Sequence, residues 1–128
     1  MEVLEINLFE YKELIDGKPI HIATVNTENN LNLAVASDVK VIEDNKILIS
    51  VNEMINTQEN IKYNPNVVLT VFDENYEGLR MFGVAEYYTD GEYFELDKKI
   101  FDEALFNERG IHIKGAIVVT INKAHKYI

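Results

Sequence analysis

The stretch that decides the fold runs over residues 46–72 and reads KILISVNEMINTQENIKYNPNVVLTVF. Its first seven residues alternate between apolar and polar side chains, which predicts a half-buried strand over residues 46–52. Its last seven residues are rich in β-branched side chains and predict a second strand over residues 66–72. The polar side chains of the first strand gather toward its C-terminal end, where the chain enters the segment between the two strands.

The segment between the strands predicts a short polar helix. Asn56 can cap its N-terminus, and Glu59 follows at the capping-box spacing. The helix runs through Tyr63 and ends at Asn64, because Pro65 disfavours helical geometry in the residue before it. The sequence therefore predicts a strand, a capped helix and a strand in direct succession.

Outside this stretch, two-residue alternation predominates, interrupted by turn residues. A capping-box pattern at Asn7 and Glu10 predicts a short N-terminal helix that ends at Gly17, and a second pattern from Thr89 predicts a helix to about Gly110. The remaining strands are predicted over residues 19–26, 31–41, 79–88 and 114–127. Strands joined mainly by hairpins favour a mainly-β fold with short helices, a small antiparallel barrel, over a parallel βαβ sheet.

Composition limits the possible partners and compartment. The 128 residues fit one domain over residues 1–128, and no apolar run is long enough to span a bilayer. The acidic N-terminus does not resemble a secretory signal, so we expect a soluble cytoplasmic protein. The net charge of −10 repels polyanions, which disfavours nucleic acid and membrane surfaces as partners. The chain has no cysteine, so disulfides and thiol chemistry are excluded.

Familiar catalytic and metal-binding patterns are missing from the sequence. His21, His112 and His125 are scattered without the spacing of metal ligands, so we expect no metal site. Ser37 and Ser50 lie in no nucleophile motif. No catalytic residue is predicted.

The start of the predicted helix at Asn56 is the best candidate for a binding site. A helix start offers free backbone N–H groups and partial positive charge, which suit a phosphate, and Thr57 adds a hydroxyl. The same two residues also fit a purely structural capping role, and spacing alone favours that interpretation.

Several fragments of the chain, in their order, resemble the FMN-binding split-barrel family, which includes pyridoxamine 5′-phosphate oxidase and small bacterial FMN-binding proteins. The resemblance covers nearly the whole chain. The fragments are residues 22–24 (IAT), 39–41 (VKV), 45–49 (NKILI), 57–67 (TQENIKYNPNV), 78–86 (GLRMFGVAE) and 114–119 (KGAIVV).

The resemblance implies a split β-barrel that binds FMN, works as an oxidoreductase or electron-transfer protein with an unidentified small-molecule or protein redox partner, and forms a homodimer with the flavin between subunits. Many relatives carry a lysine where this chain has Asn56. A flavin-free ligand-binding or interaction module, or a relative that uses heme or a deazaflavin, stays open. The cofactor-binding residues implied by the resemblance are Lys40, Ser50, Val51, Asn56, Thr57 and Gly78.

Overall fold

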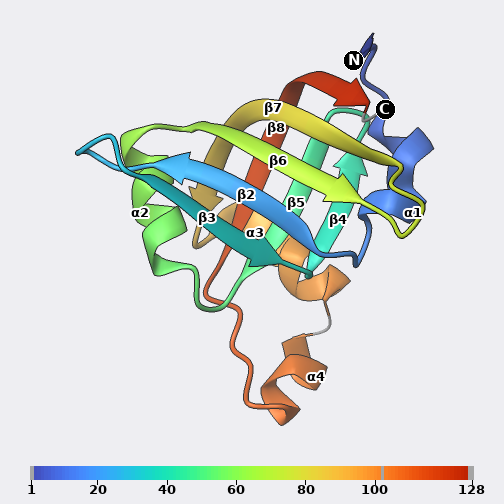
Figure 1. Ribbon diagram of the computed structural model, residues 1–128. Helices are drawn as coiled ribbons and strands as arrows, with labels where there is room; N and C mark the ends of the chain where they lie inside the picture. The colour runs from blue at the N-terminus through green and yellow to red at the C-terminus, as the bar shows by residue number, and fades with distance from the viewer. Residues whose placement is uncertain (1, 102, 127–128) are drawn as a thin grey trace.

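The computed structural model describes residues 2–101 and 103–126, and their strands form one curled antiparallel sheet (Figure 1). The strands follow the order β3-β2-β6-β7-β8-β5-β4, and β1 pairs with β8 off this path. The prediction of a mainly-β split barrel with short helices is confirmed. The strands are β1 (Glu2–Leu4), β2 (Ile20–Val25), β3 (Leu31–Ala36), β4 (Val39–Glu43), β5 (Lys46–Val51), β6 (Asn66–Phe72), β7 (Gly78–Tyr88) and β8 (Gly115–Lys126).

Short helices lie around the sheet. Helix α2 lies beside β2 and β3 at one end, α1 lies near the opposite end, and α4 projects away from the barrel (Figure 1). None of the helices in the described residues is long and apolar enough to cross a membrane. The helical segments are the 3-10 helix η1 (Leu8–Tyr11), α1 (Lys12–Ile15), α2 (Ile55–Tyr63), α3 (Gly91–Ile100) and α4 (Glu103–Glu108).

The core fills the concave side of the sheet, because alternate residues of each strand point inward. Ile22, Ile49, Leu69, Met81 and Ile117 are completely buried there. On the opposite face, α3 covers part of β5 and β8, so these strands are buried on both sides in their central stretch. The polar side that the sequence predicts for the end of β5 is therefore covered and not open to solvent.

The predicted single strand over residues 31–41 is wrong, because the structure divides it into β3 and β4. Residues 37 and 38 interrupt the extended segment. Strand β3 pairs with β2, whereas β4 pairs with β5, so the two strands lie at opposite ends of the sheet order. The alternation of apolar and polar residues keeps the same phase on both sides of residues 37 and 38. The break between β3 and β4 is therefore visible only from the different strands with which they pair.

Three predictions about helix ends are wrong. Helix α2 begins at Ile55 after Met54, so Asn56 is not its cap. Helix α3 begins at Gly91 after Asp90, so Thr89 is not its cap, and neither Met54 nor Asp90 forms a side-chain capping hydrogen bond. The helix expected from Thr89 to about Gly110 is two helices, α3 and α4. The prediction for Asn7 is confirmed in part, because its side chain accepts a hydrogen bond from the Phe9 amide at 3.2 Å but caps a 3-10 turn.

Candidate functional site

The clearest candidate site lies where β5 ends and α2 begins. Val51 is the last residue of β5, and its carbonyl oxygen accepts a hydrogen bond from the Lys114 amide at 2.8 Å. Helix α2 begins four residues later at Ile55, and its first turn contains no acidic residue. Unpaired N–H groups of a helix start and a nearby lysine form an environment that suits an anion.

The two candidate residues of α2 differ in their exposure. Asn56 is exposed, whereas Thr57 is only 1% exposed, and its Oγ1 accepts a hydrogen bond from Asn32 Nδ2 of β3 at 3.3 Å. One turn later, Asn60 Nδ2 donates to Thr24 Oγ1 of β2 at 3.0 Å. These two bonds attach α2 to the sheet, so Thr57 has a structural role independent of any ligand.

Ser50 lies on the opposite face of β5 from Val51, beneath α3. Its side chain is buried beside Asp97 of α3, and its amide donates to the Asp38 carbonyl at 2.9 Å. Burial raises the pKa of the Asp97 carboxyl to about 7, the nearby Ser50 hydroxyl lowers this pKa, and the charge of Asp38 raises it. Burial also raises the pKa of Asp38. An anion at Ser50 would therefore meet two carboxyl groups.

Lys40 takes part in an ion pair within the chain. Its Nζ lies 3.4 Å from Asp16 Oδ2, and the other oxygen of Asp16 accepts a hydrogen bond from the Val41 amide at 2.8 Å. Lys40 is therefore paired with Asp16 at the edge of the sheet, away from the start of α2.

Gly78 lies at the other end of the molecule from the start of α2. Ser50 is level with Ala116 on β8, and Ala116 is level with Tyr88 at the end of β7, whereas Gly78 is the first residue of β7. The ten residue steps from Gly78 to Tyr88 correspond to about 33 Å of extended strand. A side chain at position 78 would overlap the Val71 carbonyl oxygen, so sheet packing alone requires glycine here.

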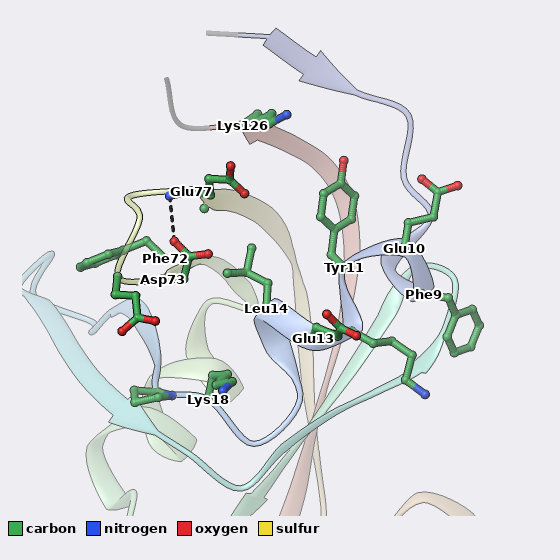
Figure 2. Close-up of a pocket in the computed structure, with 14 residues that line it drawn as sticks. Phe9, Glu10, Tyr11, Glu13, Leu14, Lys18, Phe72, Asp73, Glu77 and Lys126 are labelled. Carbon is green, nitrogen blue, oxygen red and sulfur yellow. Dashed lines mark hydrogen bonds between the residues drawn. The ribbon is translucent and has the colours of Figure 1, made fainter.

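Gly78 lines a large open cleft between the η1–α1 segment and the β6–β7 turn (Figure 2). Its volume is about 1030 Å³. Carboxylates of Glu10, Glu13 and Glu77 lie around it together with Lys18, and its walls are only partly apolar. Among the residues that the structure describes, no three His, Asp or Glu side chains are grouped to hold a metal ion.

The structure thus brings Val51, Asn56 and Thr57 to one end of the sheet, with Ser50 beside them on the other face of β5. It does not bring Lys40 or Gly78 to this place. Sequence reasoning missed Lys114, which only the pairing of β8 with β5 places beside Val51, and it missed Asp97, which looks like an ordinary helix-surface acid.

Comparison with known proteins decides the family. The sequence family of pyridoxamine 5′-phosphate oxidase matches residues 10–127 of this chain. The chain belongs to this family. An uncharacterised protein of Methanocaldococcus jannaschii is 31% identical to this family member over 118 residues, which are 91% of this chain and 77% of the relative.

Solved structures of low sequence identity share the fold. The HupZ protein of Group A Streptococcus superposes with a TM-score of 0.79 at 23% identity, over 92% of this chain and 91% of that one. An FMN-binding protein from Syntrophomonas wolfei superposes with a TM-score of 0.72 at 24% identity, over 85% of this chain and 76% of that one. The split-barrel fold of the family member described here is therefore that of both proteins.

Proposed function

We propose that this member of the pyridoxamine 5′-phosphate oxidase family is an FMN-binding flavoprotein that holds the FMN phosphate at the start of α2. The observation that carries the proposal is the acid-free first turn of α2, which is exposed at Asn56 and lies four residues after Val51, whose carbonyl oxygen accepts a hydrogen bond from the Lys114 amide. In a chain with a net charge of −10, a helix first turn without acidic residues is favourable for a dianion.

The candidate residues fit the phosphate in part. Backbone N–H groups of the α2 start would donate to the phosphate, and Lys114 would supply the positive charge that Asn56 does not. Thr57 would act mainly by holding α2 to β3 through its bond with Asn32. Bound FMN would supply hydride or electron transfer, and the protein would supply binding and orientation, as expected for an oxidoreductase or electron-transfer protein.

The separation of the candidate residues supports a homodimer. Gly78 and the start of α2 lie at opposite ends of one subunit, so a single flavin cannot contact both within that subunit. A two-fold arrangement can bring Gly78 of one copy to the α2 start of the other, because both surfaces occur twice in such a dimer. We therefore expect the flavin ring to lie between two copies.

An uncovered apolar surface supports this dimer. No helix crosses in front of β3, β2 and β6 (Figure 1). Leu33 is 65% exposed and is level with Ala23 on β2, which is level with Val68 on β6 and then with Phe82 on β7. An apolar row across four strands with an exposed leucine at its edge fits a protein–protein interface.

Ligand titration tests the phosphate site. We expect the purified protein to show flavin absorption bands, and we expect Lys114→Gln to weaken FMN binding roughly tenfold or more with little effect on riboflavin, which lacks the phosphate. Lys99→Gln, an exposed change on α3, is the matched control. Equal weakening of both ligands by Lys114→Gln would place the phosphate elsewhere.

A substitution that adds a positive charge tests the same site. Asn56→Lys adds a cation at the exposed first turn of α2, so we expect tighter FMN binding at low salt and a smaller gain at high salt, because salt screens the added charge. Riboflavin affinity should change little. An unchanged FMN affinity at low salt would contradict the placement of the phosphate.

A flavin-free interaction module is the second candidate function, and the surroundings of Ser50 favour it. Asp97 and Asp38 place two carboxyl groups beside Ser50, and Lys40 is paired with Asp16. A colourless protein that binds neither FMN nor riboflavin would support this alternative. If the protein binds a deazaflavin and not FMN, the fold assignment stands and only the proposed cofactor changes.

A further inference from the structure

Helix α3 lies on the convex face of the sheet and covers a small apolar area. The strand residues under it are Leu48, Ala116 and Val118, and side chains of α3 pack around them. Asp97 is the only residue of α3 that is completely buried. The helix therefore docks on the sheet with a carboxyl group at the centre of its contact surface.

Few interactions offset the cost of burying the Asp97 carboxyl. Neither of its oxygens has a well-formed hydrogen bond, although the Ser50 hydroxyl is near enough to favour the charged form. The charge of Asp38 acts on Asp97, has the same sign and belongs to a residue that is itself partly buried. A charged carboxylate in such a place is costly unless it is paired, whereas a protonated carboxyl is tolerated.

The charged groups around α3 whose partners are identified bind one another and not Asp97, and Lys98, the residue after Asp97, pairs with Glu95 at 3.2 Å. Lys46 of β5 contacts Glu43 of β4 at 3.5 Å and the Tyr93 hydroxyl of α3 at 3.2 Å. On β7, the Tyr88 hydroxyl donates to Glu86 at 2.7 Å. No cation from the described residues forms an ion pair with Asp97, so protonation is the remaining route to neutrality.

We propose that α3 is a proton-dependent cover of the sheet, docked while Asp97 carries a proton and released when Asp97 and Asp38 are both charged. Release would detach from the sheet the segment between β7 and β8, which contains α3 and α4. It would also expose Leu48 and Ser50 to solvent. The proposal rests on the packing of α3 and does not depend on FMN binding.

The direction of the effect follows from linkage. The pKa of Asp97 is about 7 when α3 is docked, and we expect its ordinary value of 3.8 when α3 is released into water. Between these values the released form binds fewer protons, so the equilibrium constant for release should rise roughly tenfold per pH unit. Below about pH 4 and above about pH 7 this group should make no further difference.

Amide hydrogen exchange of the full chain measures this release. Intrinsic exchange rises tenfold per pH unit, so α3 amides should show a slope of about two in a plot of log rate against pH between pH 5 and 7. Amides of the central strand β6 should exchange more slowly than those of α3 if α3 opens alone; their slope can still be about two, because Asp97 also loses its proton on global unfolding. Asp97→Asn should return the α3 slope to about one, and Glu95→Gln, on the exposed side of the same helix, should leave it near two.

Carbon NMR titration of the Asp97 carboxyl in the unmodified protein gives a second readout that does not need a variant to fold. A midpoint near 7 supports the proposal, and a midpoint near 4 overturns it. An α3 slope of about one in the unmodified protein would also overturn it. Equal free energies of opening for α3 and β6 amides would mean that α3 is released only with global unfolding, which contradicts a separate cover.

Discussion

Replacing Asp97 with asparagine should change how the stability of the whole protein depends on pH. Asparagine has nearly the same shape but cannot ionise. In the folded protein the pKa of Asp97 is about 7, against 3.8 for the ordinary group. Between these values the folded state binds a proton that the unfolded state does not, so the free energy of unfolding falls as pH rises and levels off above about pH 7.

The size of the effect follows from the same two pKa values. Each unit of difference corresponds to about 1.4 kcal/mol, so the full loss is about 4 kcal/mol, of which about 3 kcal/mol falls between pH 5 and pH 8. Asp97→Asn removes this loss. The variant should therefore be close to the parent in stability at pH 5 and more stable at pH 8.

Urea unfolding at pH 5 and pH 8 provides the measurement. The informative quantity is the difference between Asp97→Asn and the parent at the two pH values, because contributions from groups that do not interact with Asp97 cancel in it. Glu95→Gln on the exposed side of α3 should show no such difference. If the Asp97→Asn difference is the same at both pH values within about 0.5 kcal/mol, Asp97 is not the buried acid described here.

Two further substitutions probe the sheet. Leu33→Asp places a charge on the uncovered apolar face, so sedimentation should show loss of the expected homodimer with little change in the stability of the subunit; a persistent dimer would exclude this face as the interface. Gly83→Ala should lower the free energy of unfolding by about 1–3 kcal/mol or more, because the added methyl would overlap the Thr120 carbonyl oxygen of β8. Thermal unfolding checks this, and an unchanged melting temperature would show that β7 and β8 can separate there without cost.

The sequence by itself determined most of the strands, the helix between β5 and β6, and the family. Alternation over residues 46–51 and the β-branched run over 66–72 reflect burial on one side of a sheet, which every strand must satisfy locally. The order of short fragments was enough to indicate a split barrel. The helix caps at Asn56 and Thr89 were predicted wrongly, because packing of α2 and α3 against the sheet set where these helices begin.

Only the tertiary structure decided which side chains meet. Lys114 reaches Val51 through pairing of strands more than sixty residues apart, and Asp97 meets Ser50 because α3 docks across β5 and β8. The same pairing sends Gly78 to the far end of the sheet from the start of α2. Local periodicity records whether a residue faces the core, but contains no information on strand partners or helix docking, since these depend on contacts between distant parts of the chain.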